Sequence, residues 1–208
     1  MPRFADHDQR REQMARAFQR LLADDGLSRV TFARVAAEAG ISVGLIQHYF
    51  ADKDALLRFA YADCLRRIDA RIATRIEAGE AAREPISTML LDCLRELLPV
   101  DAERTTEFRV ERTLWTAAFT DESLAAIAAR ATADTHRRIA AAIDNGKHCG
   151  EVDTAADSAA AATMILATTR GLADALGLAP PPGAHAVDAA LRPPLSLVFT
   201  GECRYHER

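Results

Sequence analysis

Residues 42–49 carry side chains that can hydrogen-bond to the edges of nucleic-acid bases. At 100° per residue, Ile46 and Phe50 share one face of a helix and need an apolar environment. The opposite face then presents Gln47 and His48 to a partner. A glutamine amide can form two hydrogen bonds with adenine, and an exposed helix face of this kind fits the major groove of DNA.

The start of the same helix carries small residues that would lie nearest the bases, since helix N-termini reach base edges in such docking. Ser42 belongs to this group, and Val43 or Leu45 can contact a thymine methyl group. Gly44 costs about 1 kcal/mol relative to alanine inside a helix. We interpret it as a point where the backbone approaches DNA closely; the alternative is a glycine merely tolerated in a short helix.

The elements around this segment predict a helix-turn-helix. Thr31 is a natural N-cap for a short helix over residues 32–39, and Gly40 ends that helix. Ser42 caps a second short helix over residues 43–50.

Helical periodicity covers most of the remaining chain and no strand alternation is sustained, so we predict an all-α fold of about nine helices. A helix over residues 8–24 completes an N-terminal three-helix DNA-binding domain, residues 1–52. Residues 53–208 form a C-terminal helical domain for ligand binding and dimerisation. Its predicted helices cover residues 53–80, 85–98, 103–119, 121–145 (ended by Asn145-Gly146), 154–176 and 187–199. Pro193-Pro194 leaves open a kinked last helix or two short ones.

The segment from Val30 to Phe59 resembles the DNA-binding signature of the TetR family of bacterial transcriptional repressors. Its markers are Thr31, the linker Ala-x-x-Ala-Gly-Ile-Ser ending at Ser42, and Tyr49-Phe50-x-x-Lys53-x-x-Leu. The resemblance implies that Thr31, Tyr49 and Lys53 bind phosphate. It also implies a homodimer that binds a palindromic operator and is released by a small-molecule effector.

The reading face carries no arginine or lysine, so a bidentate guanine contact from residues 43–48 is absent. We expect Arg34, near the start of the preceding helix, to compensate. The chain has 26 basic and 30 acidic residues, for a net charge of −4. Residues 1–71 hold 12 basic and 10 acidic residues, so the DNA-binding end is slightly basic. Lysine is scarce throughout, which adds weight to Lys53.

The resemblance also implies that the last two long helices, over residues 154–176 and 187–199, pair with their symmetry mates. Small residues permit close approach of helices. The predicted partner side of the first helix has Ala159, Ala162, Thr163, Leu166, Thr169, Leu172 and Leu176. The alternative is a helix buried within its own subunit.

The stretch from Trp115 to Leu124, followed by a turn over residues 150–153, resembles the choline/betaine-regulator branch of the family. We expect an effector pocket in the C-terminal half, although each candidate could be ordinary core. The candidate ligand-binding residues are Met89, Cys93, Phe108, Arg112, Trp115, Phe119, Met164 and Thr168.

Motifs for catalysis, nucleotide binding and cofactors are missing, so we expect no enzyme, no cofactor and no metal site. Adjacent His148 and Cys149 lack a third ligand nearby in the sequence. The four cysteines are far apart, as expected for reduced thiols in the cytoplasm, and no apolar run is long enough to cross a membrane. The alternative function is an all-α ligand-binding or partner-binding protein that keeps the helix-turn-helix as scaffold.

Overall fold

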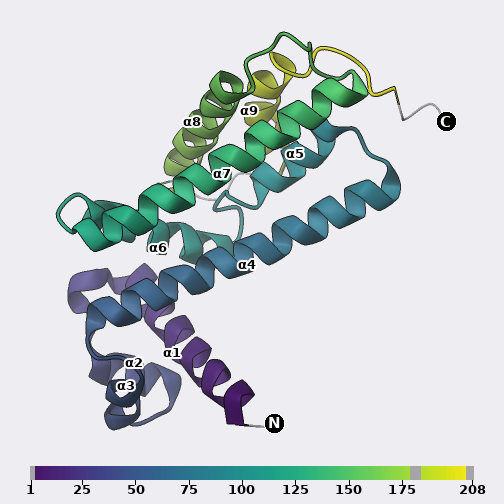
Figure 1. Cartoon of the computed structure of the whole chain (residues 1–208). Coiled ribbons are helices and arrows are strands. Elements are labelled where there is room, and N and C mark those ends of the chain that lie inside the picture. Colours follow the sequence, from purple (N-terminus) through teal and green to yellow (C-terminus); the bar gives the residue numbers. More distant parts are fainter. Residues whose placement is uncertain (1–2, 179–183, 205–208) are drawn as a thin grey trace. The chain divides into compact units, whose positions relative to one another are not determined.

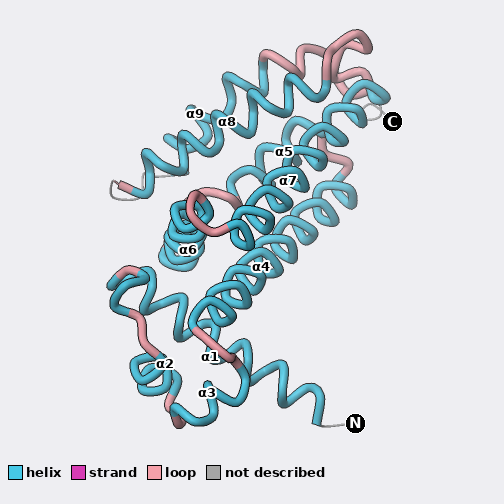
Figure 2. The backbone as a smooth tube through the Cα atoms, turned by 60° about the vertical axis from the view of Figure 1, so that its left-hand side comes forward, coloured by secondary structure: helices cyan, strands magenta, loops and turns pink. Residues whose placement is uncertain are grey.

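The computed structural model describes residues 3–178 and 184–204, and within these ranges the chain is built from helices (Figure 1). Loops connect the helices from α1 to α8 (Figure 2). The elements are α1 (Arg3–Asp25), a single 3₁₀ turn η1 (Leu27–Arg29), α2 (Phe32–Ala39), α3 (Val43–Tyr49), α4 (Lys53–Ala82), α5 (Ile86–Arg95), α6 (Ala102–Ala118), α7 (Glu122–Cys149), α8 (Ser158–Gly177) and α9 (Ala184–Ser196). The prediction of an all-α fold with about nine helices is confirmed.

The chain forms two compact units, and neither is continuous in sequence. The first holds the residues up to Arg67 together with Thr106–Ala126, and the second holds Ile68–Thr105 with the chain from Ile127 onward. Helices α4, α6 and α7 therefore contribute residues to both units. The domain boundary after residue 52 rests on the sequence motif and stays a prediction.

In the first unit, α1 packs on α2 and α2 packs on α3. The three helices share an apolar core because their apolar residues recur at three- and four-residue spacing. Phe18 of α1, Val35 of α2 and Ile46 of α3 have no exposed surface. Between α2 and α3, Gly40 has a φ of 67°, the left-handed conformation that glycine adopts without strain.

Buried polar groups tie α1 to α4 inside this unit. The Gln19 amide donates to the Ala60 carbonyl at 2.7 Å and to the Asp63 carboxylate at 3.1 Å. The Arg11 guanidinium carbon lies 4.4 Å from the centroid of the Phe59 ring, in cation–π contact. These contacts hold the start of α4 against α1.

In the second unit, α9 packs on α5 and α8, and α8 and α9 run side by side (Figures 1 and 2). Glu96, after α5, is buried and receives hydrogen bonds from Arg71 at 2.9 Å, Arg75 at 2.9 Å and Arg104 at 3.0 Å. Burial by itself would raise the pKa of Glu96. The hydrogen bonds from Arg104, Arg75 and Arg71 outweigh it and hold that pKa below its ordinary value.

Helix α7 does not end at Asn145-Gly146, as we predicted from the usual effect of glycine on helices, but continues to Cys149. Gly146 lies inside the helix, at a position where another segment packs directly on its backbone. A Cβ at this position would lie 2.7 Å from Val152 Cγ2 and 3.0 Å from Phe199 Cε1. The glycine serves close packing rather than helix termination.

Helix α8 begins at Ser158, four residues after the predicted start, because Asp157 is its N-cap. The Asp157 carboxylate accepts hydrogen bonds from the amides of Ala159 and Ala160, at 3.0 and 3.1 Å.

The side of α8 that we predicted to face a symmetry mate is wrong in part. Three of its seven members lie in the chain's own core: Ala162, Leu166 and Thr169.

Helix α9 is one helix that includes both Pro193 and Pro194, so two separate short helices are excluded. Each proline lacks the N–H that would bond to the carbonyl four residues earlier, so α9 lacks the helical hydrogen bonds to the carbonyls of Ala189 and Ala190. Among the described residues, no helix combines the length and apolar character needed to cross a membrane.

Candidate nucleic-acid interface

Helix α3 presents the face that the sequence predicts. Ile46 is fully buried and Phe50, just after the helix, is 2% exposed. On the other side, Gln47, His48 and the start of the helix are exposed, and Leu45 is half-buried. The predicted orientation of α3 is therefore confirmed, and its role in binding DNA stays a prediction.

Capping side chains fix the two short helices at their N-termini, as the sequence predicts. The Thr31 hydroxyl accepts a hydrogen bond from the Arg34 amide at 3.3 Å, and the Ser42 hydroxyl accepts one from the Leu45 amide at 3.2 Å. From α1, the Gln13 amide donates to the carbonyl of Ala39 at 2.8 Å. This last contact positions the turn. No local sequence signal predicts it, because its partners lie 26 residues apart.

Gly44 differs from the glycines whose absent side chain the fold itself explains. A Cβ on Gly44 would meet no atom within 4 Å, whereas one on Gly146 or Gly79 would collide with a packed side chain. The backbone of Gly44 is also helical, so no positive φ requires glycine. No described contact accounts for glycine at this exposed position, so a close approach of DNA and a glycine merely tolerated in a short helix both stay predictions.

Lys53, expected at a phosphate, and Arg34, expected to compensate for the missing guanine contact, both make contacts within the chain. The Lys53 ammonium donates to the carbonyl of Leu27, and Arg34 pairs with Asp25 at 2.5 Å. Both contacts fasten the segment between α1 and α2. A phosphate would have to share or replace these partners.

Tyr49 is half-buried at the end of α3, with its ring centroid 5.3 Å from that of His7 and 5.4 Å from that of His48. Thr31, the N-cap of α2, is exposed.

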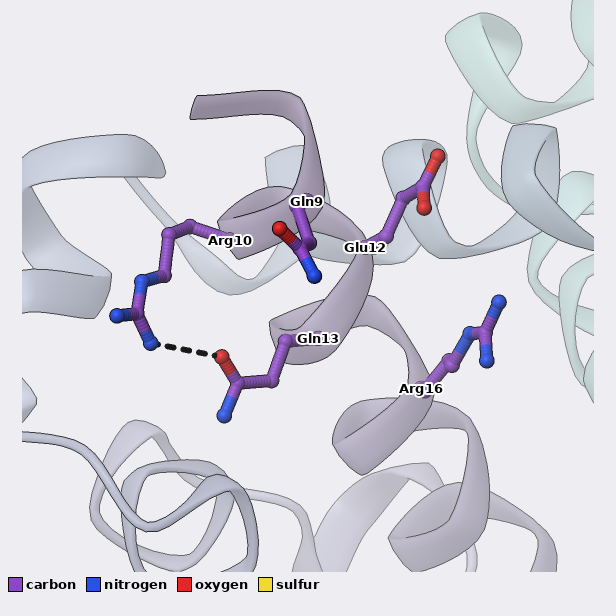
Figure 3. A pocket seen from close by; sticks show the side chains of 5 residues that line it. All are labelled: Gln9, Arg10, Glu12, Gln13 and Arg16. Atoms are coloured by element: carbon purple, nitrogen blue, oxygen red, sulfur yellow. Dashed lines mark hydrogen bonds between the residues drawn. The ribbon is translucent and has the colours of Figure 1, made fainter. Parts of the chain in front are cut away.

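A hollow of about 440 Å³ lies on α1 in the same unit and was not predicted (Figure 3). Its lining is polar: Gln9, Arg10, Glu12, Gln13 and Arg16. Within it the Arg10 guanidinium donates to the Gln13 amide oxygen at 3.1 Å. Since Gln13 also bonds to Ala39, the hollow adjoins the contact that positions the turn between α2 and α3.

The predicted effector residues divide between the two units. Those of the first unit are Phe108, Arg112, Trp115 and Phe119; those of the second are Met89, Cys93, Met164 and Thr168. In the first unit, Phe119 is 83% exposed. In the second, Met89 packs against Gly79, and burial raises the pKa of the Cys93 thiol to about 11. These eight residues stay predictions.

Two family models match the chain and together cover most of it. The model for bacterial regulatory proteins of the tetR family matches residues 17–59, which include the whole helix-turn-helix. The model for the C-terminal domain of BetI-type transcriptional repressors matches residues 87–193, just over half of the chain.

Individual relatives agree with these models. The HTH-type transcriptional regulator PksA of Bacillus subtilis is 32% identical over 111 residues, which are 53% of this chain and 52% of PksA. The chain thus spans about half the length of the curated relative it matches. The relatives are named as transcriptional regulators, which confirms the expectation that the chain is not an enzyme.

Solved structures share the fold over nearly the whole chain. A transcriptional regulator from Rhodococcus sp. Rha1 superposes with a TM-score of 0.78 at 26% identity, covering 91% of this chain and 96% of its own. A regulator from Saccharomonospora viridis, solved in complex with choline, has a TM-score of 0.73 at 20% identity, covering 89% and 93%. With the helix-turn-helix, the capped α3 and both family models in agreement, the chain belongs to the TetR family of bacterial regulatory proteins, with a C-terminal domain of the BetI type.

Proposed function

We propose that the protein is a transcriptional repressor that binds a palindromic DNA operator as a homodimer and releases it when a small molecule binds the C-terminal domain. The proposal rests on the exposed face of α3. Its first turn contains Gly44, where a Cβ would meet no atom of the chain within 4 Å. Family membership supports the same reading. A regulator of this kind acts on the chromosome, so we place the protein in the cytoplasm.

In this proposal α3 lies in the major groove with its N-terminal end nearest the bases. Gln47 reads adenine, and Val43, which is 37% exposed, contacts a thymine methyl. Lys53 and Tyr49 hold phosphates on either side, which fixes the position of α3 on the duplex without reading sequence.

For the dimer, we propose the exposed face of α8 in place of the partner side predicted from the sequence. Ala160, Ala167 and Gly171 lie along that face and are exposed, and Leu178 just beyond the helix is 93% exposed. Small side chains at seven- and four-residue intervals allow two helices to approach closely. Two copies related by a two-fold axis would present two α3 helices to two half-sites.

Release requires that the effector bind more tightly to the arrangement that cannot bind DNA. Helix α4 is one of the three helices that contribute residues to both units, and in this proposal it carries a change in the second unit to the first. The choline complex of the Saccharomonospora viridis regulator supports a small-molecule site in a domain of this fold.

Gel-shift titrations with variants test the proposal. Lys53→Ala should weaken binding to every sequence. It should also reduce the slope of the logarithm of affinity against the logarithm of salt concentration by about one, the value for one lost phosphate contact. Tyr49→Phe should also weaken binding without changing the preferred sequence, whereas Gln47→Ala should change the preferred bases.

Lys147→Ala is the matched control for Lys53→Ala, because Lys147 is the other lysine and pairs with Asp144 in the second unit. It should bind DNA as the wild type does. Equal binding of the wild type and all variants to random DNA would overturn the proposal and favour the helix-turn-helix as mere scaffold.

A further inference from the structure

Two cysteines 54 positions apart meet beside a buried carboxylate in the second unit. The ligand atoms of Cys149, Glu151 and Cys203 all lie within 4.8 Å of one another. Cys149 and Glu151 are buried, with 6% and 2% of their surfaces exposed, and Cys203 is half-buried. The sequence offered only adjacent His148 and Cys149 as a weak metal pair, and His148 proves to be exposed.

Backbone pairing holds the three side chains together. The Arg204 amide donates to the Cys149 carbonyl and the Gly201 amide donates to the Glu151 carbonyl, both at 2.9 Å. The segment after α9 thereby runs along the turn that follows α7. The approach is close enough that a Cβ on Gly201 would lie 2.2 Å from the Gly150 carbonyl oxygen. The proximity of Cys203 to Cys149 therefore follows from the backbone and not from one side-chain rotamer.

The carboxylate of Glu151 is oriented by the N-terminus of α5. Its Oε1 accepts from the Ile86 amide at 2.7 Å, and its Oε2 accepts from the Ser87 amide at 2.9 Å and the Ser87 hydroxyl at 2.7 Å. The remaining direction of Oε1 faces Cys149 Sγ at 3.2 Å. Cys149 Sγ also lies 3.3 Å from the Gly146 carbonyl oxygen, so its single hydrogen has two acceptors. A cation that replaces this hydrogen could bind both the sulfur and Oε1.

We propose that Cys149, Glu151 and Cys203 form a binding site for a thiolate-preferring divalent cation, with Zn²⁺ as the metal to test. On binding, each thiol loses its proton to solvent and both sulfurs coordinate the cation, together with Glu151 Oε1 and one water. Zn–S bonds of about 2.3 Å and Zn–O bonds of about 2.1 Å at a tetrahedral angle separate sulfur from oxygen by about 3.6 Å. The observed 3.2 Å needs only a small expansion.

Glu151 also distinguishes this site from one that would form a disulfide. A buried carboxylate attracts a cation, and it opposes the uncompensated thiolate that must attack in thiol–disulfide exchange. The three hydrogen bonds that Glu151 accepts from Ile86 and Ser87 can persist when the cation takes the place of the Cys149 proton. The bound cation would then link the ends of α7 and α5 to the segment after α9.

The test uses full-length protein, reduced and stripped of metal by a chelator, and titrated with Zn²⁺ in a calorimeter in two buffers of different ionisation enthalpy. We expect one Zn²⁺ per chain and release of about two protons. Cys203→Ser should weaken Zn²⁺ binding at least tenfold, and Cys149→Ser should do the same. Cys93→Ser is the matched control and should bind as the wild type does, because Cys93 lies outside the cluster.

Cys203→Ser is the decisive variant, since Cys203 follows the last helix and is half-buried, and circular dichroism will confirm that it folds. Zn²⁺ binding by this variant that equals wild-type binding would overturn the proposal. The proposal would also be overturned if the wild type takes up no Zn²⁺ but forms a disulfide after treatment with a small-molecule disulfide, seen in mass spectrometry as the loss of two hydrogens. No DNA enters the experiment, so its result is independent of the proposed repressor function.

Discussion

Replacing Gly44 by alanine should stabilise the free protein and weaken its binding to DNA. A Cβ at this position meets no atom within 4 Å, and the backbone is already helical. Alanine exceeds glycine in helix propensity by up to about 1 kcal/mol, and we expect about 0.5–1 kcal/mol in the first turn of α3. For a chain of this size, that gain raises the melting temperature by about 1–4 °C.

The same methyl group should obstruct DNA if the backbone of α3 lies against it. An extra methyl forced into a packed contact costs about 1–3 kcal/mol, which corresponds to a loss of roughly 5- to 150-fold in affinity. The two effects of Gly44→Ala therefore have opposite signs, and this combination separates a binding role from simple damage to the fold.

Thermal unfolding followed by circular dichroism gives the first effect, and fluorescence anisotropy with labelled operator DNA gives the second. Ala133→Gly, at an exposed position in α7, is the control: it should lower stability by a similar amount and leave DNA affinity unchanged. Wild-type affinity in Gly44→Ala would show that DNA does not approach this backbone closely.

Three further outcomes follow from contacts elsewhere in the chain. Gly171→Leu should keep the fold, since its Cβ has open space, but convert the proposed dimer to monomer in sedimentation velocity; an unchanged dimer would remove α8 from the interface. Glu96→Gln should lower the free energy of unfolding at neutral pH by about 1–3 kcal/mol. Folding lowers the pKa of Glu96, so the stabilisation from this carboxylate is complete above the ordinary pKa of 4.5 and is lost as the pH falls below that value. In denaturant titrations, the free energy of unfolding of Glu96→Gln should therefore fall less steeply with acid than that of the wild type. Parallel pH profiles for the two proteins would contradict this role of Glu96. Arg11→Ala should lower the melting temperature by removing the cation–π contact with Phe59, worth about 0.5–2 kcal/mol, and an unchanged melting temperature would show that this contact contributes nothing.

Local chemistry made the DNA-binding end predictable from the sequence. Thr31 and Ser42 cap their helices through atoms three residues away, and Gly40 ends α2 through its own conformation. The exposed face of α3 follows from the spacing of Ile46 and Phe50. None of these inferences needed a distant partner.

The errors occurred where distant segments decide the local structure. Gly146 looks like a helix breaker, but Phe199, more than 50 residues away, packs on it inside α7. Small residues occur on more than one side of α8, so composition could not tell that Ala162 faces the chain's own core. Cys203 meets Cys149 only because the segment after α9 returns to the end of α7.

Selection from a pool of random duplexes, with the wild-type protein as bait, tests whether α3 reads DNA sequence. We expect enrichment of an inverted repeat that binds at least about a thousandfold more tightly than the unselected pool, with an affinity that falls as salt rises. A pool that remains random, bound with the same affinity before and after selection, would contradict the claim that α3 reads DNA sequence.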